Sequence, residues 1–225
     1  MCAKLLSCVE IEPSKQAQAA VVWLHGLGAD GHDFEPVASQ LKLPAGLAVR
    51  FLFPHAPIRP VTVNGGMAMR AWYDSYGPDQ GGRMDLEGMA EAETQVHALL
   101  HREHERGLAY GKVVLAGFSQ GGAIALRSAA SFPHQLAGIM LLSSPLPEVD
   151  KVLARLVEGP NRTTPIFVGH GHREWALPEA VKEKIQERLT EIGCRIDWRG
   201  YPMGHGVCAE EIRDISRWLV GILGS

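Results

Sequence analysis

The feature that most constrains this chain is a serine between two glycines, placed where an apolar run meets a stretch of small apolar residues. Residues 117–121 read G-F-S-Q-G and match the pattern G-x-S-x-G. Residues 113–116 are apolar, as in a strand buried on both faces, and residues 122–126 are typical of a buried helix. A strand, a sharp turn and a helix with serine at the apex expose the serine oxygen at the edge of a sheet. The pattern therefore predicts that Ser119 is a nucleophile.

Short apolar runs alternate with amphipathic stretches along the chain. Stretches 89–100, 181–192 and 208–222 each carry apolar residues at helical spacing. The short runs are typical of buried parallel strands, and the last, more alternating one of an edge strand. They are Ala20–Leu24, Leu47–Phe53, Val113–Ala116, Gly138–Leu142, Ile166–Val168 and Arg195–Tyr201.

This alternation predicts an α/β fold with a mainly parallel sheet flanked by helices. The length of 225 residues fits one domain, residues 1–225. Residues 54–85 break the pattern, because they are rich in glycine and proline and lack periodicity. We expect them to form a long surface excursion that helps to wall a site.

Two backbone N–H groups are candidates for an oxyanion hole. The turn itself supplies the N–H of Gln120, the residue after the nucleophile. A second donor should come from the loop after an early strand, and residues 23–28 read W-L-H-G-L-G after the first apolar run. We expect Leu27 to supply it, and His25 in the same loop to be structural.

The general base should lie near the C-terminus, because a catalytic triad on this fold runs in the order serine, acid, histidine. Residues 201–206, Y-P-M-G-H-G, follow the last expected strand and precede the last amphipathic stretch. Among the ten histidines, only His205 is both this late and on a loop that ends a strand. The order predicts His205 as the base.

The acid should follow the preceding strand, and the first carboxylate there is Glu174. Glutamate can serve as the triad acid on this fold. Asp150 and Glu148, which follow the strand before, remain alternatives.

His170 and His172 form an H-x-H pair, but no further ligands follow at close spacing, so we expect no metal site.

Charge and composition limit the partners. The net charge is −3 and no basic block is present, which argues against nucleic acid. No apolar stretch approaches the roughly 20 residues that span a bilayer.

The four cysteines form no C-x-x-C pair, and two of them lie near an N-terminus expected to be loose. We expect reduced thiols and a cytoplasmic protein.

Taken together, these residues resemble the carboxylesterase and acyl-protein thioesterase (lysophospholipase-like) family of α/β-hydrolases, and its bacterial carboxylesterases most closely at residues 63–66 and 211–215. The resemblance spans residues 19–223. It rests on L-H-G-L-G at 24–28, P-H-A-P at 54–57, R-P-V-T at 59–62, A-W-Y-D at 71–74, G-F-S-Q-G-G-A at 117–123 and Y-P-M-G-H at 201–205.

The resemblance implies an α/β-hydrolase fold without a large lid domain, hydrolysis of carboxylic esters, and no cofactor. It implies the same nucleophile, base and oxyanion donors, namely Ser119, His205, Leu27 and Gln120. This chain departs from the family at two positions. Glu174 stands where the family motif H-G-x-x-D has aspartate, and Arg70 stands where the family usually has proline.

The resemblance also gives residues 60–76 two possible uses. In one, they line a pocket for the acyl or alcohol part of a substrate; in the other, the loop packs on its own core. The candidate substrate-binding residues are Val63, Met67, Met69 and Trp72, with Val61 beside them.

The sequence thus favours a serine carboxylesterase that acts on a small ester or acyl thioester through a Ser-His-Glu triad and an acyl-enzyme. The alternative is a catalytically impaired α/β-hydrolase homologue that only binds a ligand. A monomer and a homodimer are both compatible with the sequence.

Because the sequence predicts no metal site, a first prediction concerns treatment with a chelator. Prolonged treatment with a chelator should leave ester hydrolysis unchanged, because His170 and His172 are not expected to bind a metal. The measurement is the rate on a p-nitrophenyl ester before and after dialysis against chelator. A loss of rate that zinc restores would contradict the expectation.

Overall fold

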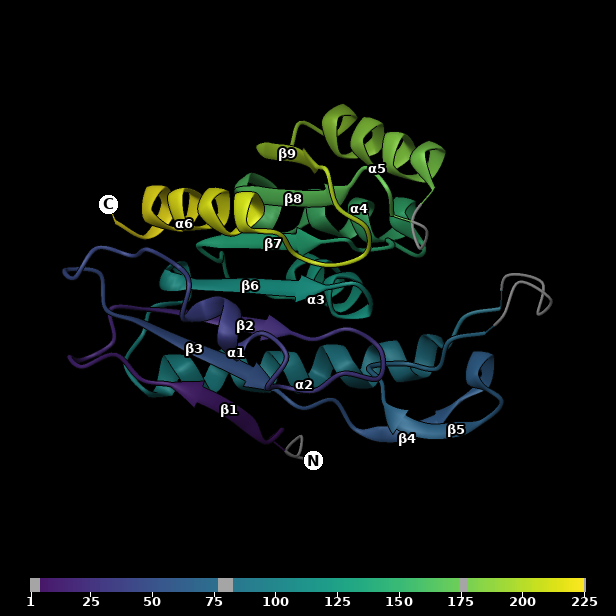
Figure 1. Ribbon diagram of the computed structural model, residues 1–225, viewed down its shortest axis with the longest axis horizontal. Coiled ribbons are helices and arrows are strands. Elements are labelled where there is room, and N and C mark those ends of the chain that lie inside the picture. Colours follow the sequence, from purple (N-terminus) through teal and green to yellow (C-terminus); the bar gives the residue numbers. More distant parts are fainter. Residues whose placement is uncertain (1–4, 77–82, 175–177, 225) are drawn as a thin grey trace.

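The computed structural model describes residues 5–76, 83–174 and 178–224. Its centre is a seven-stranded sheet in the order β1-β3-β2-β6-β7-β8-β9 (Figure 1). All neighbouring strands pair in parallel except β1, which pairs antiparallel with β3. The strands are β1 (Cys8–Ile11), β2 (Ala19–Leu24), β3 (Val49–Pro54), β6 (Val113–Phe118), β7 (Gly138–Leu142), β8 (Ile166–Gly171) and β9 (Ile196–Tyr201).

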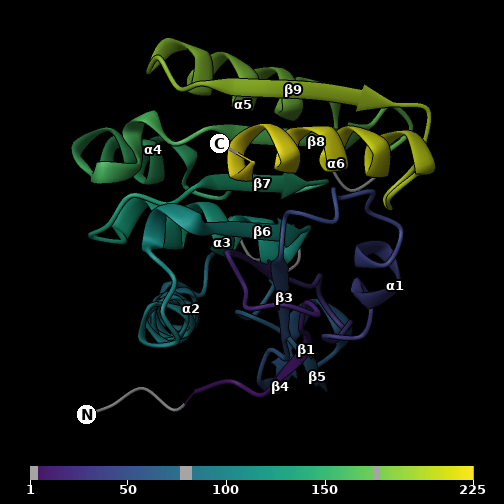
Figure 2. The same ribbon diagram turned by 90° about the vertical axis from the view of Figure 1, so that its left-hand side faces the viewer.

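Helices cover both faces of the sheet, as Figure 2 shows with α1 and α6 on one side and α2, α3, α4 and α5 on the other. Each face has its own apolar core, because alternate side chains of the buried strands point to opposite faces. The mainly parallel α/β fold expected from the sequence is confirmed. The helices are α1 (Glu35–Ala38), α2 (Leu86–Glu105), α3 (Gln120–Ser131), α4 (Val149–Glu158), α5 (Glu179–Glu191) and α6 (Ala209–Leu223).

The six strands expected from apolar runs are all present, and β9 is an edge strand as expected. The sequence did not indicate β1, which falls in the N-terminal region expected to be loose. Its four residues, C-V-E-I, are too short to show an alternation, and the strand exists because the edge of β3 offers free hydrogen-bonding groups.

The irregular stretch 54–85 contains a hairpin made of β4 (Ile58–Val61) and β5 (Met67–Arg70). A short 3-10 turn (Thr62–Asn64) and two glycines with positive φ, Gly65 and Gly66, connect the strands. The hairpin projects from the body of the molecule beyond the end of α2 (Figure 1). Residues 77–82 of this stretch lie outside the described residues.

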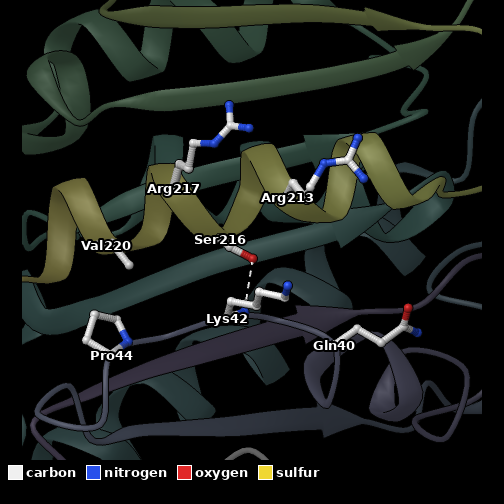
Figure 3. Close-up of a pocket in the computed structure, with 7 residues that line it drawn as sticks. All are labelled: Gln40, Lys42, Pro44, Arg213, Ser216, Arg217 and Val220. Carbon is white, nitrogen blue, oxygen red and sulfur yellow. Dashed lines mark hydrogen bonds between the residues drawn. The ribbon is translucent and has the colours of Figure 1, made fainter.

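A cavity of about 480 Å³ lies between α6 and the segment that follows α1. Figure 3 shows its lining: Gln40, Lys42, Pro44, Arg213, Ser216, Arg217 and Val220. None of the site residues expected from the sequence lines this cavity. Separately, no helix in the described ranges is both long and apolar enough to cross a bilayer.

The first turn of α3 packs directly on the end of β2, and this contact requires glycine at position 121. A Cβ built on Gly121 would lie 2.4 Å from the carbonyl oxygen of Leu24 and 2.5 Å from that of His25. Backbone atoms cannot move aside as a flexible side chain can. Gly121, two residues after the serine, therefore allows the turn to approach the end of β2 this closely.

This contact predicts that Gly121→Ala lowers the free energy of unfolding by about 1–3 kcal/mol, the usual cost of overpacking a core. Urea denaturation followed by circular dichroism would measure it. Gly46→Ala is the matched control, because a Cβ there meets nothing within 4 Å and should change the free energy little. Equal stability of the two variants would contradict the prediction.

Candidate active site

Ser119 occupies a strained turn between β6 and α3. Its φ of 51° and ψ of −121° lie in a region that a residue with a side chain adopts only at a cost. Hydrogen bonds hold the turn on both sides. The Ser119 N–H donates to the carbonyl of Leu142 at 2.9 Å, and the Ser119 carbonyl accepts from the Gly122 N–H at 3.0 Å. The serine is thereby fixed at the N-terminus of α3, where the helix dipole favours negative charge.

The loop after β2 lies against this serine. A Cβ built on Gly26 would be only 3.4 Å from the Cβ of Ser119. No backbone hydrogen bond between described residues uses the N–H of Leu27 or of Gln120 as its donor. The two expected oxyanion donors therefore lie in segments that approach each other at Ser119.

A chain of buried hydrogen bonds holds the loop in place. The Ala56 N–H donates to Nε2 of His25 at 3.0 Å, and Nε1 of Trp72 donates to the His25 carbonyl at 2.8 Å. The Trp72 N–H in turn donates to Oε1 of Gln120 at 2.8 Å. Burial lowers the pKa of His25, which favours the neutral ring that accepts from Ala56. The structure thus places His25 in a structural role.

The side chain of Gln120 was not singled out by the sequence. Its Nε2 donates to the Tyr73 carbonyl at 2.9 Å and to the Ser75 hydroxyl at 3.2 Å. Gln120 therefore ties residues 72–75 to the first residue of α3. No sequence signal identifies this function, because the partners lie 45–48 residues away in the chain.

His205 and Glu174 meet beside the serine turn. Nδ1 of His205 lies 2.6 Å from Oε1 of Glu174, within hydrogen-bond distance. The His205 ring also packs on Phe118, the residue before the serine, with ring centroids 4.8 Å apart. Glu174 follows β8, and His205 lies in the loop between β9 and α6. Two loops that follow neighbouring strands thus bring the expected acid and base together.

The Glu174 side chain is wholly buried yet favours the ionised form. Burial alone would raise its pKa, but the hydrogen bond with His205 and the nearby His170 ring outweigh burial and lower it to about 2. Nδ1 of His170 lies 3.6 Å from Oε2, and the Gly171 N–H donates to the same oxygen at 3.4 Å. Both carboxylate oxygens therefore have neighbours that favour negative charge.

The other candidates of the sequence analysis lie elsewhere. Asp150 pairs with Arg188 at 2.7 Å, and Glu148 pairs with Lys151 and Arg127. His170 is buried against Glu174, whereas His172 is exposed. No group of three or more metal-binding side chains occurs within residues 5–76, 83–174 and 178–224. His170 was considered only as a metal ligand in the sequence, and its contact with the acid was missed.

Of the four residues considered for substrate binding, three lie on the hairpin surface. Val63 and Met67 are exposed, Met67 to 64%, and Met69 is half-buried. A Cβ built on Gly28 would lie 3.6 Å from the Met69 sulfur, so the hairpin adjoins the loop of Leu27. Trp72 is 0% exposed and belongs to the hydrophobic core. Its Nε1 donor is satisfied inside the core, which explains why this aromatic side chain points inward.

Comparisons with known proteins show which proteins this chain is similar to. Residues 7–222 match the model of the phospholipase/carboxylesterase family. Acyl-protein thioesterase 1 of Neurospora crassa is 35% identical over 210 residues, which cover 89% of this chain and 85% of that protein. Carboxylesterase SOBER1 of Arabidopsis thaliana is 32% identical over 208 residues, 90% of each chain. Among solved structures, acyl-protein thioesterase 2 of Zea mays superimposes with a TM-score of 0.83 at 26% identity, covering 97% of this chain and 99% of that one.

The contact between Glu174 and His205 predicts how substitutions at Glu174 affect hydrolysis. Glu174→Gln keeps the size but removes the charge that stabilises a protonated imidazole, so kcat should fall on the order of 10⁴-fold. Glu174→Asp keeps the charge and should retain much of the rate. Steady-state kinetics on a p-nitrophenyl ester would measure both, and a near-normal kcat for Glu174→Gln would remove Glu174 from the site.

Proposed function

Since this chain belongs to the phospholipase/carboxylesterase family, we propose that it hydrolyses carboxylic esters through a triad of Ser119, His205 and Glu174. The family and its relatives make the protein a carboxylic-ester hydrolase of the carboxylesterase and acyl-protein thioesterase type. The single observation that carries the triad is the 2.6 Å contact between His205 Nδ1 and Glu174 Oε1 beside the strained serine turn.

In the first half of the reaction, Ser119 Oγ attacks the acyl carbon while His205 accepts the serine proton. The carbonyl oxygen becomes an oxyanion, which the N–H groups of Leu27 and Gln120 bind. The tetrahedral intermediate then collapses. The bond between the acyl carbon and the leaving group breaks, His205 returns its proton to the leaving alcohol or thiol, and an acyl-enzyme remains.

In the second half, water attacks the acyl-enzyme and gives its proton to His205. The second tetrahedral intermediate collapses, the acid product leaves, and His205 returns the proton to Ser119 Oγ. Throughout, the Glu174 carboxylate holds the His205 ring in one tautomer and stabilises the imidazolium formed in each half. Its buried, ionised state supports this role.

Substrate binding on this proposal involves the hairpin. Val63 and Met67 offer exposed apolar surface on the hairpin, and Met69 lies next to Gly28 in the loop of Leu27, so this surface is suited to an apolar acyl or alcohol group. We therefore propose a small ester or acyl thioester as the substrate. A panel of oxygen and thiol esters of increasing chain length would rank the two classes.

The alternative is a homologue that binds ligands but turns over poorly, which the replacement of aspartate by Glu174 would favour. The contact of Glu174 with His205 and the ionised state of this carboxylate argue for turnover instead. Labelling with a fluorophosphonate probe separates the two, because the probe reacts covalently only with an activated serine.

We also propose that the protein works in the cytoplasm, which is a reducing compartment. Cys8, Cys194 and Cys208 are free thiols in the structure, and Cys2 lies outside the described residues. Burial raises the pKa of Cys8 to about 11, which keeps this thiol in its unreactive form.

The nucleophile assignment gives the decisive test. Ser119→Ala should lower kcat by about 10⁶-fold and abolish probe labelling, because the triad acts as a unit. Ser144→Ala is a suitable control, since Ser144 is buried nearby and its hydroxyl already donates to the Leu142 carbonyl. Activity of Ser119→Ala within about tenfold of wild type would refute the proposal.

A further inference from the structure

Glu211 is a buried carboxyl group that the mechanism above does not use. It is the third residue of α6 and is 0% exposed. Neither of its oxygens makes a full hydrogen bond with a described residue. The backbone of Cys208 is close enough to favour the charged form without reaching hydrogen-bond geometry. An ionised carboxylate in such a place would be costly, so the group needs an explanation.

The position of Glu211 links the two halves of the proposed triad. Its Oε1 lies against Gly169 in β8, where a Cβ would come within 2.0 Å of the oxygen. Gly169 precedes Glu174 by five residues, and Glu211 follows His205 by six. The carboxyl group therefore sits where α6 packs on β8, between the segment that carries the acid and the segment that carries the base.

The charges around Glu211 oppose its ionisation. Burial raises its pKa to about 8, and the negative charges of Glu174 and Asp214 act in the same direction. From β9, the Tyr201 hydroxyl donates to Asp214, and burial, followed by the negative charges of Asp214 and Glu211, raises the pKa of this hydroxyl. From β8, His170 contacts Glu174.

The nearby cations are already engaged with other carboxylates. Arg199 pairs with Asp197 and Asp214, and Arg217 pairs with Asp214. No cation among the described residues is paired with Glu211, in contrast to Asp214 one turn later in the same helix. Asp214 has cations that stabilise its charge, whereas Glu211 is buried without one, which favours the uncharged form of Glu211.

We propose that Glu211 is a positioning residue that must stay uncharged: as a neutral carboxyl it lets α6 pack tightly on Gly169 and so keeps His205 against Glu174. This inference rests on the proposed triad. Ionised Glu211 could regain hydration only if the first turn of α6 separated from β8. Since His205 lies just before this turn, the separation would draw the base away from the acid.

Two substitutions test the proposal, and one serves as a control. Glu211→Gln keeps the shape without the ability to ionise, and Glu211→Met removes the polar atoms, so one variant remains informative if the other folds poorly. Glu210→Gln changes the neighbouring residue of the same helix turn, which is exposed. Wild type and all three variants are compared as full chains.

The first measurement is the melting temperature as a function of pH, which needs no enzymatic activity. The folded-state pKa of Glu211, about 8, is above the value of an unfolded glutamate. Its stabilising effect is therefore complete below about pH 4 and is lost as the pH rises through about 8. The melting temperature of Glu211→Gln or Glu211→Met, relative to wild type, should increase from about pH 5 to about pH 8. Glu210→Gln should parallel wild type.

The second measurement is the pH profile of kcat/KM. Wild type should lose activity above about pH 8, falling at least about threefold below the Glu211→Gln variant by about pH 9 when both are normalised at neutral pH. The acid side of the profile should keep its midpoint in Glu211→Gln, because one uncharged group replaces another. A purely structural role would lower activity equally at all pH values.

The outcomes separate this inference from the proposed function. A melting-temperature difference that does not change with pH, or a downward shift of the acid-side midpoint in Glu211→Gln, would show that Glu211 is ionised or uncoupled and would overturn the inference. Identical alkaline profiles for wild type and both Glu211 variants would overturn it as well. Activity that survives in Ser119→Ala would instead overturn the triad and leave the melting result intact.

Discussion

The strained turn at Ser119 is the constraint around which the rest of the site is arranged. A serine with φ of 51° persists only because its backbone is held from both sides, by the carbonyl of Leu142 and by the first turn of α3. That helix must approach β2 so closely that only glycine fits at position 121. The same approach brings the loop of Leu27 to the nucleophile. The strained turn, the start of α3 and the loop after β2 therefore depend on one another for their positions.

Sequence order was enough to find the main elements, because a parallel sheet gathers the loops that follow its strands at one edge. The strand runs, and the loops that carry Ser119, Glu174 and His205, follow from this rule. The pattern could not find β1, which depends on a neighbouring strand edge. It could not decide the direction of Trp72, which is fixed by a hydrogen bond to a backbone carbonyl 47 residues away. The roles of His170 and Glu211 were missed because they depend on burial against Glu174 and Gly169, which sequence spacing does not reveal.

The replacement of aspartate by glutamate changes how the acid is held. Glutamate is one methylene longer, and here the carboxylate still reaches His205 at 2.6 Å while its other oxygen faces His170 and the Gly171 N–H. Burial penalises such a charge, and the surrounding donors offset that penalty. A buried carboxylate with donors on both oxygens is also rotationally fixed. The longer side chain thus keeps a defined direction, which a catalytic orientation requires.

The side chain of Gln120 anchors the segment that follows the hairpin, but not the tip of the hairpin. Its three hydrogen bonds hold residues 72–75, and Thr62 and Val63 in turn hydrogen-bond to Asp74 and Ser75, whereas residues 64–68 at the hairpin tip are exposed. Changes at the tip therefore need not disturb the proposed oxyanion donors. A protein built in this way can acquire a new substrate range by mutation of a few exposed residues, while selection on the chemical step acts on a separate, buried set.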